Sequence, residues 1–267
     1  MARANRHYVP GQVWHITHRC HKKEFLLKFA KDRRRWCYWL FQAKKRFGLQ
    51  VLDYVATSNH VHLLVVDTKP EVIAKSMQLI AGRTGQEFNQ RKGRKGAFWE
   101  DRYHATAVER NEHLMRCLVY IDLNMVRAGV VGHPGEWQLN GYNEIQNPPA
   151  RYAVIDRSSL IRVCGFTDYT QFVGQHRRWV EDSIAEGNKC RESYWTESIA
   201  VGSSTFIEEV KIKLGFNAKG RRINEHPDGS CFLKEETASY TVDFGSENGS
   251  LSCENAFFWN EIVSDSK

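Results

Sequence analysis

The sequence predicts an α+β fold: a ferredoxin-like split βαβ sheet with an added helix on its second face, followed by a mainly helical C-terminal region. Two observations predict it. Segments rich in β-branched residues alternate with segments of helical periodicity, in the order strand, helix, strand, strand, helix, strand. A further helical segment follows the last strand, and the second face of such a sheet needs a helix to cover it.

The first predicted strand, residues 12–20, follows the turn pair Pro10-Gly11 and alternates in its side chains. The first helix, residues 30–47, has apolar residues at i, i+4, i+7 and i+11. Two strands follow, residues 50–56 and 60–66, with a short polar turn between them. The end of the second of these is continuously apolar, which indicates a strand covered on both faces.

A second helix is predicted over residues 70–91 because proline stands in its first turn. Residues 100–108 supply the fourth strand. The third helix, residues 111–128, is predicted to begin at Asn111 as N-cap and to end at Gly129. This third helix is the candidate for covering the sheet's second face.

The chain divides into three predicted parts. Residues 1–147 form the α+β domain, and a Pro-Pro linker follows it. Residues 148–224 are predicted as a helical accessory region, with helical pattern over 160–185 and 205–214. Residues 225–267 are rich in Gly, Ser, Asn and acidic residues and are predicted to be a loosely structured acidic tail.

The net charge of +7 is distributed unevenly. Residues 225–267 carry nine acidic and two basic side chains, so residues 1–224 carry 36 basic and 22 acidic ones, a net charge of +14. A body of that charge favours nucleic acid as its partner, because binding releases condensed counterions. A basic surface that serves only solubility is the alternative.

The seven cysteines include no C-x-x-C pair, which favours a reducing compartment over a disulfide framework or a zinc finger. The N-terminus leads into no apolar segment, and the sequence has no run of about 18 apolar residues. We therefore expect a cytoplasmic protein without membrane association.

Two histidines, His60 and His62, flank a single valine. Side chains on a strand alternate between faces, so the two imidazoles point the same way, roughly 6.5 Å apart along the chain, and could bind one divalent ion. On the predicted helix, Tyr120 and Asn124 are i,i+4 neighbours, which brings a phenol and an amide oxygen to one face. Together they could form a metal site beside a nucleophile. The simpler alternative is hydrogen-bonded histidines and a packing tyrosine.

Three segments occur in the order Thr57-Ser58-Asn59-His60-Val61-His62-Leu63-Leu64-Val65, Phe98-Trp99-Glu100-Asp101-Arg102-Tyr103 and Tyr120-Ile121-Asp122-Leu123-Asn124-Met125-Val126-Arg127-Ala128-Gly129. In that order they closely resemble the signatures of the single-tyrosine HUH transposases, in particular the REP-associated tyrosine transposases of bacteria, which contain an IS200-like transposase domain. The resemblance covers the first predicted domain. It departs at Met125, where the family commonly has proline.

By this resemblance His60, His62 and Asn124 are metal ligands, and Tyr120 is the catalytic tyrosine. The implied function is a metal-dependent single-stranded DNA endonuclease and strand transferase that forms a 5′-phosphotyrosine intermediate on palindromic, REP-like hairpins in transposition. Imidazole nitrogens with an amide oxygen suit Mg²⁺ or Mn²⁺. No small-molecule cofactor is expected, and a monomer and a homodimer both remain open.

Basic residues are predicted to support this chemistry. Arg116 and Arg127 lie on the helix face of Tyr120 and could stabilise the phosphate or the phenolate. Contacts to DNA need cations for phosphates and aromatic rings for unstacked bases. The candidates, in the N-terminal arm and in a basic loop, are Arg3, Arg6, Tyr8, Arg91, Lys92, Arg94 and Lys95.

Three other functions compete with this one. A domesticated, non-catalytic DNA- or RNA-binding regulator would keep the fold without the chemistry. A relaxase or rolling-circle initiator would use a similar site, but it usually carries a helicase region for which this chain is too short. A metal-dependent hydrolase would use water as the nucleophile and would not need Tyr120.

Overall fold

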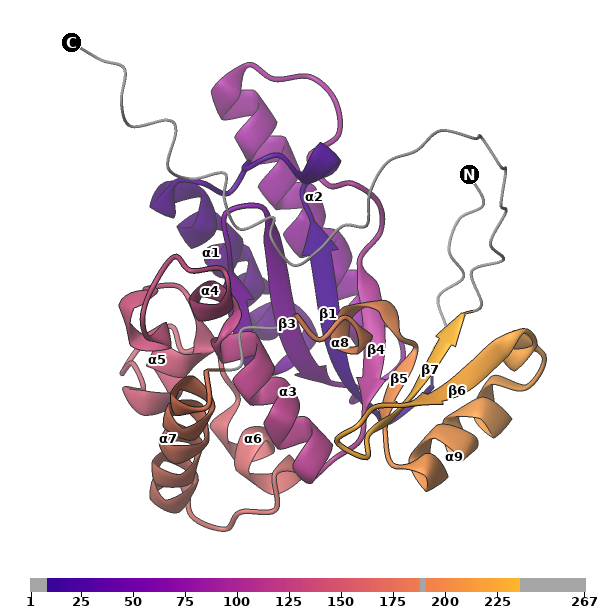
Figure 1. Cartoon of the computed structure of the whole chain (residues 1–267). Helices are drawn as coiled ribbons and strands as arrows, with labels where there is room; N and C mark the ends of the chain where they lie inside the picture. Colours follow the sequence, from indigo (N-terminus) through magenta and orange to yellow (C-terminus); the bar gives the residue numbers. More distant parts are fainter. Residues whose placement is uncertain (1–8, 188–190, 236–267) are drawn as a thin grey trace, which may run out of the picture. The chain divides into compact units, whose positions relative to one another are not determined.

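A seven-stranded sheet, in the order β2-β3-β1-β4-β5-β7-β6, runs through the part of the chain that the computed structural model describes, residues 9–187 and 191–235 (Figure 1). β1, β2, β3 and β4 form its antiparallel half, β4 pairs in parallel with β5, and β7 and β6 complete it as an antiparallel hairpin. The strands are β1 (Val13–Arg19), β2 (Gln50–Ala56), β3 (His60–Val66), β4 (His104–Val108), β5 (Ala200–Gly202), β6 (Arg221–Glu225) and β7 (Cys231–Glu235).

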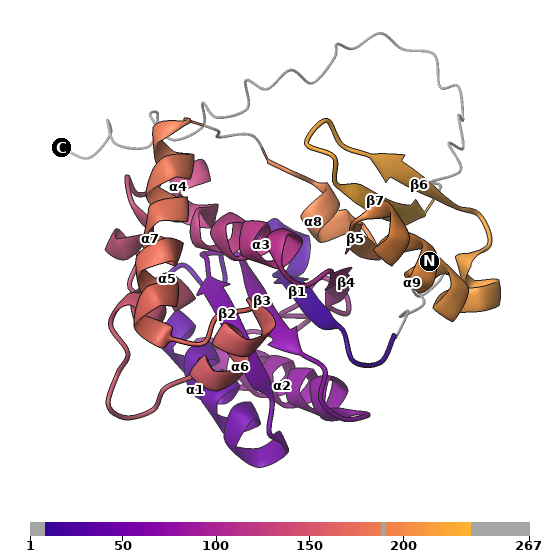
Figure 2. The same ribbon diagram turned by 90° about the horizontal axis from the view of Figure 1, so that it is seen from below.

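The principal helices lie on both faces of the sheet. The pair α1 and α2 covers one face, and α3 lies against the other together with α7 (Figure 2). The helices are α1 (Ala30–Phe47), α2 (Val72–Lys92), α3 (Glu112–Asp122), α4 (Asn124–Arg127), α5 (Gly141–Gln146), α6 (Arg157–Val163), α7 (Tyr169–Ala185), α8 (Tyr194–Glu197) and α9 (Ser204–Leu214), with short 3₁₀ turns at His21–Lys23, Pro134–Glu136 and Gly215–Ala218. None of the described helices is long and apolar enough to cross a membrane.

The core forms where these layers meet. On α1, Trp36, Leu40 and Ala43 are fully buried, in agreement with the predicted spacing. The strand β3 is covered on both faces, as its continuous apolar run predicts: Val61 and Leu64 are both inaccessible to solvent although they point to opposite faces. This burial fixes the register of β3, because a slip of one residue would move its polar side chains to the opposite face.

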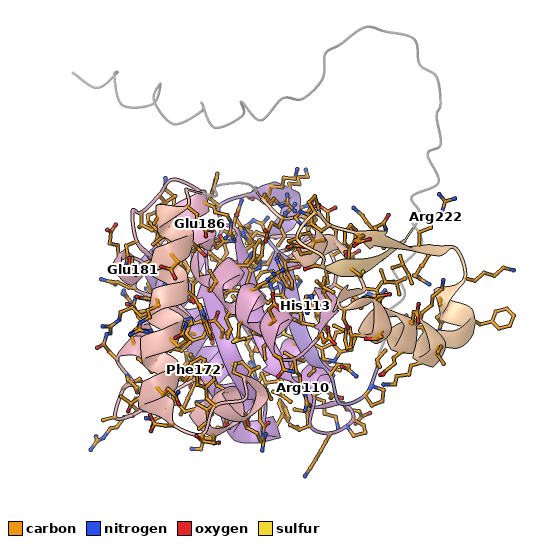
Figure 3. All side chains as sticks on the ribbon, turned by 60° about the horizontal axis from the view of Figure 1, so that its bottom comes forward. Arg110, His113, Phe172, Glu181, Glu186 and Arg222 are labelled. Atoms are coloured by element: carbon orange, nitrogen blue, oxygen red, sulfur yellow. The ribbon has the colours of Figure 1, made fainter. Side chains whose placement is uncertain are left out.

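The amphipathic helix α7 packs against α3 in the layer of helices on the second face. Its buried residues Phe172, His176 and Val180 recur every four residues, whereas Glu181 on this helix and Glu186 just after it are exposed (Figure 3). Inside the layer, His176 Nε2 lies 2.8 Å from a carboxylate oxygen of Asp122 on α3, with both side chains fully buried.

The predicted third helix is interrupted. It consists of α3 and α4, separated at Leu123, whose φ of −78° and ψ of 4° are not helical. The two pieces remain linked, because the Leu123 amide donates to the Val119 carbonyl at 3.0 Å and the Arg127 amide donates to the Leu123 carbonyl at 2.8 Å. Asn111 stands at the N-cap position, but its φ of 65° is unlike that of a standard cap and its side chain makes no capping bond. The helix therefore begins at the predicted N-cap, but without the side-chain bond that usually accompanies one.

The C-terminal region contains α6, α7 and α9 over the segments predicted to be helical, and also the short helix α8 and three strands that the sequence does not predict. β5 has only three residues, too few to show an alternating pattern. The expected loosely structured tail from Glu225 was wrong for residues 225–235, because they belong to the β6–β7 hairpin. Residues 236–267 lie outside the described part of the chain.

A buried carboxyl on β2 gives a testable pH dependence. Asp53 is inaccessible to solvent, and its Oδ2 has no hydrogen-bond partner among the described residues. Burial, with a smaller effect from Asp122, raises the pKa of Asp53 well above its ordinary value of 3.8. A raised carboxyl pKa stabilises the fold below the ordinary value, and this contribution is lost as pH rises through the folded-state pKa.

We therefore expect Asp53→Asn, which cannot ionise, to stabilise the protein relative to the wild type increasingly as pH rises. Urea unfolding at pH 5, 7 and 8.5 measures the difference in the free energy of unfolding. A difference that stays constant or shrinks with rising pH would contradict a buried, protonated Asp53.

Candidate active site

Strands β1 and β3, the segment 100–104, helices α3 and α4 and residues 191–197 enclose a cavity of 470 Å³. The cavity is lined by His60, His62, Tyr120 and Asn124, four residues from separate parts of the chain, so the fold brings the predicted set together. Four arginines line it as well: Arg19, Arg102, Arg127 and Arg191. Three carboxyl side chains, Glu100, Asp101 and Glu197, also line it, so the lining carries both charges with a small excess of arginines.

His60 and His62 share one face of β3, as their spacing predicts, and their ring centroids are 5.0 Å apart. The Nδ1 of His60 lies 2.7 Å from the Asn59 side-chain oxygen and 3.0 Å from the Thr57 hydroxyl. Because the Asn59 oxygen can only accept, His60 Nδ1 carries the proton and donates it. His60 Nε2 is therefore an unprotonated ring nitrogen with a lone pair available for a ligand.

His62 is hydrogen-bonded to another histidine, His15. Its Nδ1 lies 2.9 Å from Nε2 of His15 on β1, and Nδ1 of His15 lies 2.9 Å from the carbonyl oxygen of Trp195 on α8. On its other side, Nε2 of His62 lies 3.0 Å from Nδ2 of Asn124. An amide NH₂ is a donor, so Nε2 of His62 carries no proton and accepts the hydrogen bond from Asn124.

All three imidazoles are neutral at physiological pH. Burial lowers the pKa of His60 to about 4, with Arg19 and Arg191 adding to the effect. Burial, reinforced by the neighbouring His60, lowers the pKa of His62 well below 6.5. Burial also lowers the pKa of His15 to about 3. Neutral imidazole is the form that binds metal ions.

Tyr120 lies on α3, next to these rings. It is 5% exposed, and its ring centroid is 6.0 Å from those of both His15 and His62. The Arg127 guanidinium lies 4.1 Å from the Tyr120 ring centroid and donates to the Tyr120 carbonyl at 2.5 Å. Burial raises the pKa of Tyr120, and the positive charges of Arg127 and Arg191 oppose this rise. The phenol is thus protonated at rest, beside two cations that favour its ionised form.

The donor set fits an open divalent-metal site. His60 and His62 present unprotonated Nε2 atoms, and rotation of the Asn124 amide about its terminal bond would present an oxygen in place of its NH₂. The described residues include no group of three or more His, Cys, Asp or Glu with the geometry of a metal site. Three protein ligands of mixed nitrogen and oxygen type would leave coordination positions for a substrate.

Comparison with known proteins agrees with this arrangement. Residues 9–124 match the family described as Transposase IS200 like. The match covers less than half of the chain, which is similar to this family over that segment. The match spans both histidines, the tyrosine and the asparagine of the cavity. The resemblance noted in the sequence is thereby confirmed at the level of the family.

Two solved structures are similar to the chain at low identity. One is a REP-associated tyrosine transposase bound to a REP hairpin, with 16% identity and a TM-score of 0.46, covering 58% of this chain and 94% of that one. The other is a protein of Deinococcus radiodurans R1 assigned as a transposase, with 18% identity and a TM-score of 0.33, covering 43% of this chain and 91% of that one. No curated protein matches the chain.

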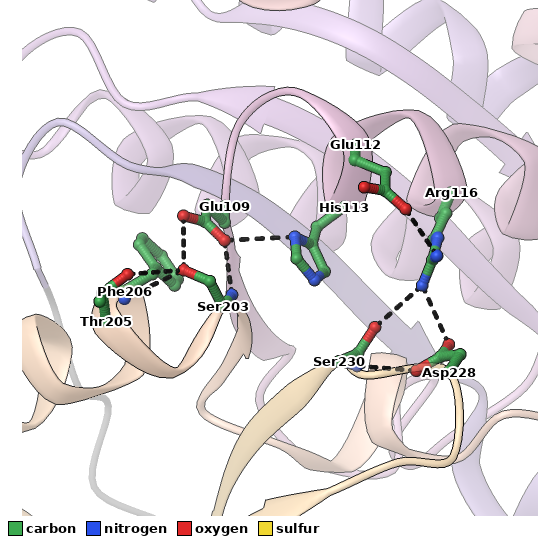
Figure 4. A network of polar contacts seen from close by, with 9 residues as sticks. All are labelled: Glu109, Glu112, His113, Arg116, Ser203, Thr205, Phe206, Asp228 and Ser230. Carbon is green, nitrogen blue, oxygen red and sulfur yellow. Dashed lines mark hydrogen bonds and ion pairs between the residues drawn. The ribbon is translucent and has the colours of Figure 1, made fainter.

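The two arginines predicted near the tyrosine of the IS200-like domain differ in position. Arg127 contacts Tyr120 and lines the cavity of the histidines, whereas Arg116 lines only a neighbouring cavity of 560 Å³, to which Tyr120 and Arg127 also contribute. Arg116 donates to Glu112 at 2.6 Å and to Ser230 at 3.1 Å, and it forms an ion pair with Asp228 at 3.1 Å (Figure 4). Its charge is thus engaged in joining α3 to the β6–β7 turn.

The basic loop of the IS200-like domain follows α2. Arg91 pairs with the buried Asp32, and Arg94 donates to the Ala97 carbonyl at 2.7 Å. Lys92 lies 5.4 Å from the Phe29 ring centroid, and Lys95 is exposed. The other predicted DNA contacts, Arg3, Arg6 and Tyr8, lie outside the described residues.

Sequence reasoning missed several residues at this site, among them His15, Arg191 and Trp195. His15 follows the alternation of its strand, but only the pairing of β1 with β3 reveals that it faces His62. Arg191 and Trp195 lie beyond the segment that matches the IS200-like family, and Trp195 contributes a backbone carbonyl. No side-chain motif marks such a contribution.

Proposed function

We propose that this protein is a metal-dependent single-stranded DNA endonuclease and strand transferase that works through a 5′-phosphotyrosine intermediate. The observation that carries the proposal is that His60 and His62 direct unprotonated Nε2 atoms to the cavity that Tyr120 and Arg127 also line. The similarity of residues 9–124 to the IS200-like transposase family supports it.

The chemistry is a transesterification at phosphorus. A divalent cation, Mg²⁺ or Mn²⁺, held by His60, His62 and Asn124, would neutralise charge on a non-bridging phosphate oxygen. The Tyr120 oxygen attacks phosphorus, a bond from tyrosine to phosphorus forms, and the bond from phosphorus to O3′ breaks. The phenol proton is transferred overall to the departing O3′, so the products are a 5′-phosphotyrosine and a free 3′-OH.

The cations near the tyrosine assist this step. Arg127 and Arg191 lower the free energy of the phenolate against the opposing effect of burial. The same charges attract the scissile phosphate and oppose the negative charge that develops in the transition state. Because the phosphotyrosine keeps an ester bond to phosphorus, a DNA 3′-OH can later displace Tyr120 and join strands without ATP.

We propose palindromic, REP-like hairpins as the substrate, acted on in the cytoplasm during transposition by a monomer or a homodimer. This substrate follows from the resemblance of the sequence to the REP-associated transposases. The net charge of +14 on residues 1–224 supports a nucleic-acid partner. Incubation of a labelled hairpin oligonucleotide with Mn²⁺, followed by denaturing electrophoresis, tests the proposal through the covalent protein–DNA species.

One observation favours a second candidate function, a non-catalytic DNA- or RNA-binding regulator on the same fold. Tyr120 is only 5% exposed, and burial raises its pKa, so its resting state is not that of an ionised nucleophile. If the hairpin binds without forming any covalent species, this second function is the correct one.

DNA binding should weaken steeply with salt. If the basic body contacts about four to six phosphates of single-stranded DNA, the logarithm of affinity should fall by roughly 0.7 per contact for each tenfold rise in salt. Fluorescence anisotropy with a labelled hairpin between 50 and 500 mM NaCl, with a neutral polymer of similar length as competitor, measures the slope. A flat response, or equal binding of the neutral polymer, would contradict binding through phosphates.

A further inference from the structure

We infer that His15 is a positioning residue for His62, and that the segment 191–202, which lies beyond the family match, completes the candidate metal site through it. The inference rests on the proposed function, because it concerns the same site. It rests on a line of two consecutive hydrogen bonds, one between the Trp195 carbonyl and His15 and one between His15 and His62.

The groups at the two ends of this line decide which atom donates in each hydrogen bond. A carbonyl oxygen only accepts, so Nδ1 of His15 donates to Trp195 at 2.9 Å. At the other end, the Asn124 amide nitrogen donates to Nε2 of His62, so His62 carries its proton on Nδ1 and donates it to Nε2 of His15, 2.9 Å away. The proton of His62 is thereby placed on Nδ1, and Nε2 is left as a lone pair directed to Asn124 and the cavity.

The segment that contains Trp195 is anchored by burial and by hydrogen bonds. The Trp195 side chain is fully buried, and its ring N–H donates to Glu192 at 2.8 Å. Three residues later, the Ser198 carbonyl accepts from Thr106 at 2.7 Å and from His104 at 2.9 Å, which ties the segment to β4. These anchors leave the Trp195 carbonyl little freedom to move, so it fixes the ring of His15.

Loss of His15 would leave the buried Nδ1–H of His62 without its acceptor. A buried donor without a partner is costly, so the ring would turn or change tautomer and carry its proton on Nε2. A protonated Nε2 cannot bind a metal ion. Outer partners of this kind, which hold a ligating histidine in place, typically change metal affinity about 10- to 100-fold when they are removed.

The test uses the full chain and three variants. His15→Leu removes the acceptor, and His15→Gln supplies an amide that can accept from His62 and donate to Trp195. His104→Leu is the matched control: it also removes an imidazole that donates to the 191–202 segment, and His104 is half-buried. Its hydrogen bonds go to Ser198 and Thr106, and Thr106 continues to hold the Ser198 carbonyl in this variant. Titration with Mn²⁺, followed by electron paramagnetic resonance of the free ion, gives the affinity. Ring ¹⁵N shifts measured without metal give the His62 tautomer.

We expect His15→Leu to weaken Mn²⁺ binding by about 10- to 100-fold and to remove the Nδ1–H form of His62, His15→Gln to restore most of both, and His104→Leu to change neither. Unchanged affinity and tautomer in His15→Leu would overturn the inference. Equal losses in His15→Leu and His104→Leu would also overturn it, because they would indicate general loosening of the fold.

The proposed function and the positioning role of His15 can be refuted independently of each other. If the wild type binds Mn²⁺ but forms no covalent DNA species, the transesterification is refuted, while the variants still decide the role of His15. If the wild type binds no Mn²⁺, the metal site is refuted. The ¹⁵N shifts then decide whether His15 sets the tautomer of His62. If His62 keeps its Nδ1–H form in His15→Leu, the positioning role is overturned; if His62 loses that form, the role is supported.

Discussion

Tyr120→Phe should abolish both cleavage of a hairpin oligonucleotide and the covalent protein–DNA species. The substitution removes one oxygen and keeps the ring that lies beside His15, His62 and the Arg127 guanidinium. The fold and the metal affinity should therefore be retained while the attacking atom is lost. Denaturing gel electrophoresis with Mn²⁺ and a label placed 3′ of the cut measures the outcome, because a 5′-phosphotyrosine retains that part of the strand.

Tyr142→Phe and Tyr103→Phe are the matched controls. Tyr142 is as buried as Tyr120, but it packs against His133 and His176, and neither Tyr142 nor Tyr103 lines the cavity. Both variants should form the adduct. Continued nicking by Tyr120→Phe, with a product that carries no protein, would identify water as the nucleophile. A slow band that retains a label placed 5′ of the cut would reverse the polarity.

His62→Ala should lower the cleavage rate by at least about 100-fold and leave hairpin binding largely intact, because the lost ligand acts on charge that develops in the transition state. His60→Ala should behave in the same way. Asn124→Ala should cost less, since water can replace one amide ligand. Single-turnover cleavage in Mn²⁺ and fluorescence anisotropy in the same buffer separate the two effects.

The control for these substitutions is His113→Ala. His113 lies at the start of α3, where it is 3.2 Å from Glu109, and it does not line the cavity (Figure 4). Its loss should leave cleavage within a few-fold of the wild type. Full activity of the wild type in excess chelator would exclude the proposed metal site altogether, whatever the variants do.

Much of the fold could be predicted because its information is local. The bounds of β2, β3 and α1 agree with their hydrophobic periodicity, since each element buries one or both faces against the same core. The relation of His60 to His62 was predictable for the same reason: residues two positions apart on a strand share a face. The shared face of Tyr120 and Asn124 was less secure, because the helix is interrupted at Leu123 between them.

The remainder of the site depends on contacts between distant parts of the chain. His15 lies 47 residues before His62 and 180 before Trp195, and strand register rather than spacing brings them together. Asn111 shows another limit: a residue type typical of an N-cap adopts a positive φ here and makes no capping bond. The strands β5 to β7 were missed because short strands carry little pattern of their own.

The parallel pairing of β4 with β5 limits how such a protein can arise by recombination of gene segments. The backbone amides of Ala107 and Glu109 donate to carbonyls of Ile199 and Val201, at 2.8 and 3.0 Å. A gene fragment that ended with the family match at residue 124 would encode a β4 with one side unpaired, and exposed strand edges recruit other chains. A lineage that lost its C-terminal segment would therefore need another cover for β4. For this reason we expect the two segments to be retained together.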